Sequence, residues 1–232
     1  MRPSRTTCAL LAVLAGALLE CAGCMPAVGW LVNTFAPPKK IDALYKPPAG
    51  KTMLVFVDDL INPVSYEPIK GELTAQLNSV LEANKVSGRT VRYEDLLSLM
   101  ASTPGFNRLS VSEVGQKLGA DIVLYVKIDR FSLKENEATP LWQGTLATTV
   151  RMVEVQKGRL WPDDRPEGYP VRPAETTPQT HPSPTYGEVL SKILAIQMAD
   201  RIGKLFYDHS IPADEARQQE ATRDSGMDSP NG

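Results

Sequence analysis

All three cysteines of this chain, Cys8, Cys21 and Cys24, lie within its first 24 residues. No pair of cysteines is left to crosslink the rest of the chain, so the fold has to be held together by a hydrophobic core. Such a core is possible because 42% of the residues are hydrophobic and 22% are charged, which is ordinary for a globular protein. With 232 residues, the chain fits one domain with tails, or at most two small domains.

The amino terminus has the organisation of a secretory signal peptide. Residues 1–7 contain two arginines and no acidic residue, and residues 8–19 are the apolar or small residues CALLAVLAGALL. A helix of this length is too short to cross about 30 Å of hydrocarbon. A basic start followed by a short apolar segment therefore predicts a signal peptide over residues 1–23.

The four residues Cys21-Ala22-Gly23-Cys24 resemble the bacterial lipobox. In that pattern, small residues precede a cysteine that is acylated and becomes the new amino terminus. We therefore predict that Cys24 carries lipid, with acyl chains such as palmitate in the membrane. Each buried methylene contributes about 0.8 kcal/mol, so two or three long chains would make the attachment permanent. The expected location is the periplasmic side of the cell envelope, on the outer membrane rather than the inner one.

Two other fates of the amino terminus stay open. Cleavage at the A-x-A sequence of residues 15–17 would release a soluble, secreted binding domain. Retention of residues 8–35 would give an uncut anchor. Glu20 lies in the middle of that segment, and a carboxylate near the bilayer centre costs several kcal/mol, which argues against this alternative.

Two segments that flank the domain lack the pattern of a core. Residues 36–50 contain two Pro-Pro pairs, which favour extended polyproline geometry, so we expect residues 24–50 to form a lipidated, semi-rigid spacer. Residues 211–232 are polar and have no apolar stripe, which predicts a disordered tail. The α/β domain is then expected to span residues 51–210.

The first half of this domain alternates between predicted strands and helices. Residues 51–57 are a β-prone apolar run, and residues 66–85 carry apolar side chains at helical spacing. A short strand is expected over residues 89–93. Ser110 and Glu113 have the spacing of a capping box, which predicts the start of a two-turn helix.

Two long strands are expected in the second half. Residues 122–133 and 142–152 alternate between apolar and polar side chains. In the first of them the apolar positions change from even to odd numbers near Asp129 and Arg130, which moves them to the other face. We therefore predict a β-bulge at this point. A further short strand ends at Trp161.

The end of the domain contains a segment without apolar periodicity, followed by a segment with a clear helical period. Residues 162–184 hold seven prolines and no apolar periodicity, which predicts a long irregular loop, functional or disordered. Residues 186–207 are predicted to be helical. Their apolar stripe, read as a core face rather than an oligomer contact, consists of Leu190, Leu194, Met198, Ile202 and Phe206.

The predicted fold class is α/β, in the broader α+β sense: a small mixed β-sheet with helices packed on it. The expected order of elements is β-α-β-α-β-β-β-α. No internal repeat is present.

Several of these segments resemble a bacterial envelope superfamily. The resemblance rests on the strand that ends near Phe56, on the helix–Gly119-Ala120-Asp121–strand step, and on a hairpin with a Gly turn that ends at Trp161. Members include curli-secretion lipoproteins, the amino-terminal domain of the TolB translocation protein, and related assembly lipoproteins. The resemblance implies a fold over roughly residues 50–207. It implies no catalytic residues, because these relatives are assembly and pore proteins.

Acidic residues at two places are the candidates for chemistry. Asp58 and Asp59 follow a strand, where the sites of α/β proteins often lie, and they could serve in catalysis or cation binding. Asp163 and Asp164 raise the same possibility. At both places the ordinary alternative is that Asp favours turns because its carboxylate accepts local backbone hydrogen bonds.

Other signatures of catalysis or cofactor binding are missing from the sequence. Neither His181 nor His209 has a partner at metal-ligand spacing, and there is no nucleophile elbow or phosphate-binding Gly loop. We therefore predict no metal, no cofactor and no enzymatic activity.

Partners can be predicted only by class. The net charge is −2 and no run of Lys and Arg follows the signal peptide, so nucleic-acid binding is not expected. Trp161 and Tyr169 could bind a protein partner, since Trp and Tyr favour interfaces; alternatively, Trp161 closes the core beneath the Pro-rich loop.

We therefore predict a lipid-anchored envelope scaffold or assembly lipoprotein that contacts an unidentified protein. A homo-oligomeric secretion or export ring or pore subunit is the alternative, and a soluble secreted binding domain is the second.

Overall fold

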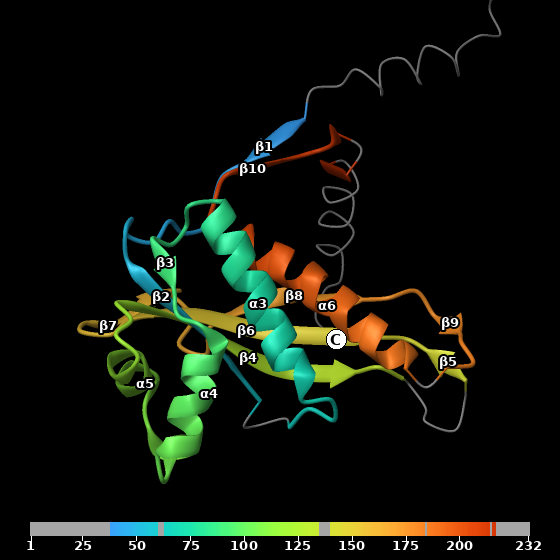
Figure 1. Cartoon of the computed structure of the whole chain (residues 1–232). Helices are drawn as coiled ribbons and strands as arrows, with labels where there is room; N and C mark the ends of the chain where they lie inside the picture. Colours follow the sequence, from blue (N-terminus) through green and yellow to red (C-terminus); the bar gives the residue numbers. More distant parts are fainter. Residues whose placement is uncertain (1–37, 60–62, 135–139, 184, 214, 217–232) are drawn as a thin grey trace, which may run out of the picture. The chain divides into compact units, whose positions relative to one another are not determined.

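The computed structural model describes residues 38–59, 63–134, 140–183, 185–213 and 215–216 (Figure 1). The predicted signal peptide, the lipidation site Cys24 and most of the predicted tail lie outside these described residues. The chain divides into two compact units.

Among the described residues, the smaller unit combines residues 38–41 with residues 209–213 and 215–216. Within it, β1 (Lys39–Ile41) pairs antiparallel with β10 (His209–Ile211). The predicted spacer therefore contains a strand, and β10 extends to the first residue of the predicted tail. The three residues of β1 lie between the two Pro-Pro pairs of the spacer, so their N–H groups are available for a ladder.

The larger unit, residues 42–208, is built on a mixed six-stranded sheet in the order β3-β2-β4-β6-β7, with β8 also paired to β6. Strand β2 is parallel to β3 and β4, whereas β6 is antiparallel to β4, β7 and β8. The strands are β2 (Thr52–Asp58), β3 (Arg89–Thr90), β4 (Ile122–Ser132), β6 (Thr145–Glu154), β7 (Gly158–Trp161) and β8 (Tyr169–Glu175). The predicted fold class is confirmed.

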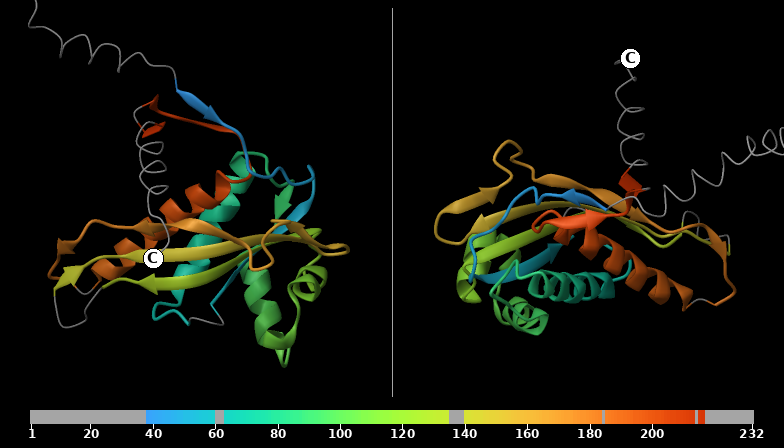
Figure 2. Two further views of the ribbon diagram at one scale, coloured as in Figure 1. Left: turned by 180° about the vertical axis from the view of Figure 1, so that it is seen from behind. Right: turned by 90° about the horizontal axis from the view of Figure 1, so that it is seen from above.

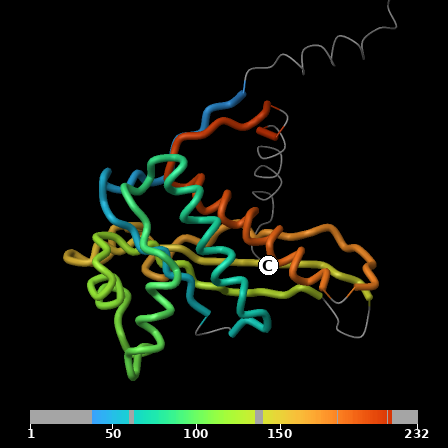
Figure 3. Tube along the Cα trace, viewed as in Figure 1, coloured from blue at the N-terminus to red at the C-terminus, as the bar shows by residue number. Residues whose placement is uncertain are grey.

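One face of this sheet is covered by two long helices, α3 (Pro68–Ala83) and α6 (Tyr186–Gly203). They lie side by side in front of the strands in Figure 1, and Figure 2 shows them behind the strands in the reverse view. The Cα trace in Figure 3 follows both along the sheet. Fully buried residues of this larger core include Leu73, Leu77, Leu124, Leu146, Leu194 and Met198.

The opposite face carries a smaller core. Successive side chains of a strand point to opposite faces, so Leu54 and Phe56 of β2 and Val123 of β4 leave the larger core and face the other way. They are covered by α4 (Tyr93–Ser102), the single-turn helix η2 (Phe106–Arg108) and α5 (Val111–Lys117). Leu96 and Val114 supply the buried side chains of these helices.

Two local predictions are confirmed. The register of β4 against β6 shifts between Ile128 and Arg130, as expected for a bulge at this position. At the start of α5, the Ser110 hydroxyl accepts the Glu113 amide proton at 3.2 Å, and the Ser110 amide donates to the Glu113 carboxylate at 2.7 Å. The bulge reorients the end of β4, and the capping box fixes where α5 begins.

The prediction of an irregular loop over residues 162–184 is wrong. Residues 169–175 form β8 along β6, and β9 (Gln179–Thr180) pairs with β5 (Leu141–Trp142) in a second small sheet. Proline is tolerated in an edge strand, where some N–H groups need no ladder partner. The register shift within this pairing places the buried Val171 and Ala174 three residues apart, so no period of two is visible.

No helix of the described residues combines the length and the apolar character needed to cross a bilayer.

Candidate functional site

Two neighbouring parallel strands of the sheet lead to helices on opposite faces. Strand β2 continues into α3 on one face, while its parallel neighbour β3 continues into α4 on the other face. In α/β proteins, ligands bind in the crevice outside the carboxyl ends of such strands. The carboxyl end of β2 is marked by Asp58 and Asp59.

A cleft of about 550 Å³ is lined by the carboxyl-terminal residues of β2, and none of its lining residues comes from β3. Its residues come from β2, α3, the α4–η2–α5 segment, β4 and the β6–β7 hairpin. Its apolar lining includes Phe56, Met100, Phe106, Leu109 and Val111. The cleft is therefore formed where the smaller core ends and the sheet becomes exposed.

The floor of the cleft is a row of three side chains on neighbouring strands. Phe56, Tyr125 and Arg151 are in register across β2, β4 and β6. The rings of Phe56 and Tyr125 pack edge to face with centroids 5.6 Å apart, and the Arg151 guanidinium lies 4.5 Å from the centre of the Tyr125 ring. This stacking positions Arg151 through a cation–π contact.

Asp58 is bound to the same tyrosine. The Tyr125 hydroxyl donates a hydrogen bond to the carboxylate of Asp58, a residue that is only 8% exposed. Burial raises the pKa of Tyr125, and the hydrogen bond and the negative charge of Asp58 raise it further. The tyrosine is therefore protonated at neutral pH and can donate to Asp58.

Asp59 is held by a different set of donors. Its carboxylate accepts hydrogen bonds from the Val64 amide at 3.0 Å and from the Lys70 ammonium of α3 at 3.0 Å. Burial alone would raise the pKa of Asp59, but these donors outweigh it and lower the pKa below its usual value. Both acids predicted as candidates thus line the cleft, and both are engaged in hydrogen bonds.

Two arginines of the cleft differ from these acids in their hydrogen bonding. Within the described part of the chain, neither Arg151 nor Arg159 forms an ion pair or a hydrogen bond, and the Arg151 Nε is buried. Arg159 is exposed at the rim, on β7. The sequence did not single out either residue, because a lone arginine in an alternating strand is normally a solvated side chain.

The other predicted acidic pair is not part of this site. Asp163 and Asp164 are exposed and do not line the cleft, and Asp164 forms an ion pair with its neighbour Arg165 at 3.4 Å. The structure therefore brings Asp58 and Asp59 together with other polar groups but leaves Asp163 and Asp164 in solvent.

Trp161 and Tyr169, the predicted partner-binding residues, lie together in the larger unit with ring centroids 5.2 Å apart. Trp161 also packs against Tyr45 and Phe206 and is only 8% exposed, which is the core-closing arrangement. Tyr169 is partly exposed. Partner binding by this pair stays a prediction.

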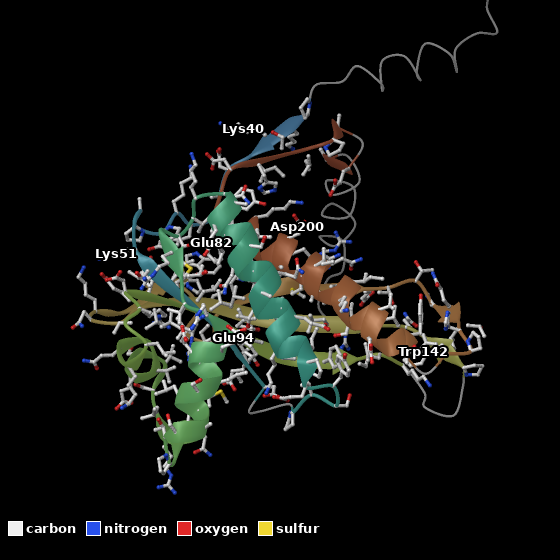
Figure 4. The ribbon with its side chains drawn as sticks, in the orientation of Figure 1. Lys40, Lys51, Glu82, Glu94, Trp142 and Asp200 are labelled. Atoms are coloured by element: carbon white, nitrogen blue, oxygen red, sulfur yellow. The ribbon has the colours of Figure 1, made fainter. Side chains whose placement is uncertain are left out.

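The two histidines have structural surroundings. His181 stacks on Tyr186 with ring centroids 4.2 Å apart, and its Nδ1 accepts the Ser183 amide proton at 3.1 Å. Trp142 packs against Tyr186 of this cluster, and Figure 4 shows it far from Glu94 of α4. His209 lies in β10. Among the described residues, no group of His, Cys, Asp and Glu could hold a metal ion.

A second surface feature lies on α6. Val189, Ile193 and Ile196 are 36–52% exposed and follow each other at helical spacing, on the side of the helix away from the larger core. The predicted stripe from Leu190 to Phe206 is buried, as expected for a core face. The helix thus has a second, exposed apolar stripe.

No family model matches the chain, and no curated protein matches it either. Among solved structures, the chain is similar to the PelC dodecamer from Paraburkholderia phytofirmans, with 11% sequence identity and a TM-score of 0.38 over 74% of this chain and 98% of PelC. It is similar to lipoprotein GNA1162 from Neisseria meningitidis, with 16% identity and a TM-score of 0.37 over 66% of this chain and 99% of that one.

A minor lipoprotein from Acinetobacter baumannii is similar at 12% identity and a TM-score of 0.32, over 68% of this chain and 91% of the lipoprotein. The solved structures that this chain resembles therefore include bacterial lipoproteins. The more specific resemblance to curli-secretion lipoproteins and TolB stays a prediction.

Proposed function

We propose that this protein is a lipid-anchored lipoprotein of the cell envelope that acts as a scaffold or assembly factor through contacts with other proteins. The proposal rests on one observation, the Cys21-Ala22-Gly23-Cys24 sequence after a short basic and apolar segment. Acylation at Cys24 would fix the folded unit beside a bilayer.

The exposed stripe of α6 supports the protein-contact part of this proposal. Val189, Ile193 and Ile196 place three branched apolar side chains on one helix face, and contiguous exposed apolar residues favour protein interfaces. Tyr125 donates a hydrogen bond to Asp58, and Lys70 donates one to Asp59. These bonds fix the positions of both carboxylates, so the cleft presents a defined surface to a protein partner.

The alternative is a homo-oligomeric export ring or pore subunit, in which the α6 stripe would contact a second copy of the chain. Native mass measured in detergent separates the two. A monomer, or a complex with a different protein, supports the scaffold, whereas a defined multiple of the chain mass supports the ring.

The test of anchoring is mass spectrometry of the native amino terminus. We expect a mature chain that begins at Cys24, with the mass of diacylglycerol on its sulfur and acyl groups on its amine. The Cys24→Ala variant is the matched control and should be released from membranes by a carbonate wash. A native chain that begins at Leu18, or an unmodified Cys24, would refute the anchor.

A further inference from the structure

The cleft at the carboxyl end of β2 has an excess of cationic groups. Its lining contains two carboxylates, Asp58 and Asp59, and three cations, Lys70, Arg151 and Arg159. Asp58 is hydrogen-bonded to Tyr125, and Asp59 is paired with Lys70 at 3.0 Å. The lining therefore holds one more cation than carboxylates, and within the described residues neither Arg151 nor Arg159 forms an ion pair, so both can attract an anion from outside.

The geometry of Arg151 favours a carboxylate. A guanidinium offers parallel N–H donors that match the two oxygens of a carboxylate. Arg151 is already oriented by the Tyr125 ring, with 4.5 Å between the guanidinium and the ring centroid, so less rotamer freedom is lost on binding. Arg159 lies at the exposed rim, where it can attract the same charge.

The other lining residues of the cleft favour a ligand that has apolar and hydrogen-bonding groups in addition to a negative charge. Met100, Phe106 and Leu109 form an apolar wall, on which an apolar side chain could be buried. Asn107 and Ser112 are also part of the lining, and neither side chain forms a hydrogen bond within the described residues. These amide and hydroxyl groups suit peptide N–H and C=O groups, which a fatty acid lacks.

From these observations we propose that the cleft binds the free carboxyl end of a polypeptide whose last residue is apolar. Capture of a terminal carboxylate beside an apolar pocket is a recurrent mode of peptide recognition. The volume of about 550 Å³ lies within the range of ligand pockets, roughly 300–1,000 Å³, and leaves room for a few residues. This inference rests on the proposed function in that it names the part of a protein partner that the scaffold would hold.

The experiment measures binding to the full-length, detergent-solubilised protein. Four fluorescein-labelled hexapeptides that end in Leu, Phe, Val or Met are titrated by fluorescence polarisation, each with a free carboxylate and each as a carboxamide. We expect at least one free acid to bind, and its carboxamide to bind at least tenfold more weakly. Raised salt should also weaken the binding of the free acid.

Two variants locate the site. Arg151→Gln should weaken binding at least tenfold, and Arg159→Gln, at the exposed rim, should weaken it about threefold. Arg159 lies in solvent, so its variant tests the site even if Arg151→Gln disturbs the fold. The matched control is Arg130→Gln, an exposed arginine of β4 outside the cleft, which should bind as the unchanged protein does.

Equal binding of acid and carboxamide, or unchanged binding by both cleft variants, would overturn the proposal. Binding of dodecanoate, measured by isothermal titration calorimetry, without binding of any peptide would overturn it as well, because the ligand would then be a fatty acid. These results are independent of the anchor. A chain that binds the peptides but lacks lipid at Cys24 would refute the proposed function and leave the peptide site standing.

Discussion

The two faces of the central sheet differ in how completely they are covered. The face under α3 and α6 is closed, and its core extends along β2, β4, β6 and β8. The face under α4 and α5 is covered over β2 and over the first residues of β4. Beyond that point it carries partly exposed polar side chains such as Lys127, Asp129 and Thr149.

This difference suggests that the closed face contributes most of the stability, whereas the half-covered face provides the binding site. A closed face removes apolar surface from water along whole strands, and buried apolar area is the main contribution to folding free energy. A half-covered face creates a boundary between apolar and polar side chains, and the cleft lies at this boundary. We therefore expect substitutions on the closed face to affect stability most, and substitutions at the boundary to have smaller and more specific effects.

The largest effect is expected for Leu124→Ala in the centre of the larger core. Leu124 is fully buried on β4, so its truncation leaves a cavity as well as lost contacts. The free energy of unfolding should fall by about 3–5 kcal/mol. Urea denaturation followed by circular dichroism measures this loss, and a loss below that of a surface substitution would show that the larger core does not dominate stability.

Leu96→Ala makes the matched change in the smaller core. Leu96 is also buried, on α4, but it belongs to a cluster of only seven buried residues, which can relax toward the nearby cleft. We expect a loss of about 2–3 kcal/mol in the same denaturation experiment. Equal losses for Leu96→Ala and Leu124→Ala would remove the proposed distinction between the two faces.

Tyr125→Phe tests the boundary itself. The substitution keeps the ring beneath Arg151 but removes the hydrogen bond to the buried Asp58 carboxylate, at an expected cost of about 1–2 kcal/mol at pH 7. Tyr66→Phe is the control, since the Tyr66 hydroxyl forms no hydrogen bond within the described residues, and it should change stability by less than about 0.5 kcal/mol.

The pH dependence of the same variant has a definite sign. The pKa of Tyr125 is higher in the folded protein than its ordinary value of 10.0, so folding favours the protonated form. Its contribution is fully present below pH 10 and is lost as the pH rises above that value. The stability difference between the unchanged protein and Tyr125→Phe should therefore shrink in alkaline solution; a constant difference would contradict this assignment.

The smallest effect is expected for Asp59→Asn. The lost ion pair with Lys70 is partly exposed, so the cost at pH 7 should be about 1 kcal/mol. Because the pKa of Asp59 is lowered in the folded protein, this stabilisation is present above its ordinary value of 3.8 and is lost as the pH falls below it. Asp95→Asn, in the exposed pair with Arg92, is the control and should cost less.

Features that depend on a local residue pattern could be predicted from the sequence. The bulge at Asp129, the capping box at Ser110 and the core stripe of α6 each follow from a local pattern. Strand β8 could not be predicted, because two prolines and a register shift erase its alternation. The local pattern contains no information on which edge of β6 this segment will pair with.

The candidate site was predictable only in part. Asp58 and Asp59 were identified from their place after a strand, but Arg151 gains its significance from Tyr125, which is distant in sequence. Cross-strand register brings these side chains together, and register depends on the whole sheet. The exposed stripe of α6 was visible as apolar residues, whereas its exposure depends on how α6 packs.

The prolines of β8 have a consequence for aggregation. Strand β8 borders β6, and Pro170 and Pro173 deprive it of two amide protons. At the other margin, β3 is only two residues long. Neither margin of the sheet therefore offers a long, regular row of free N–H and C=O groups. This disfavours the pairing of strands between neighbouring molecules.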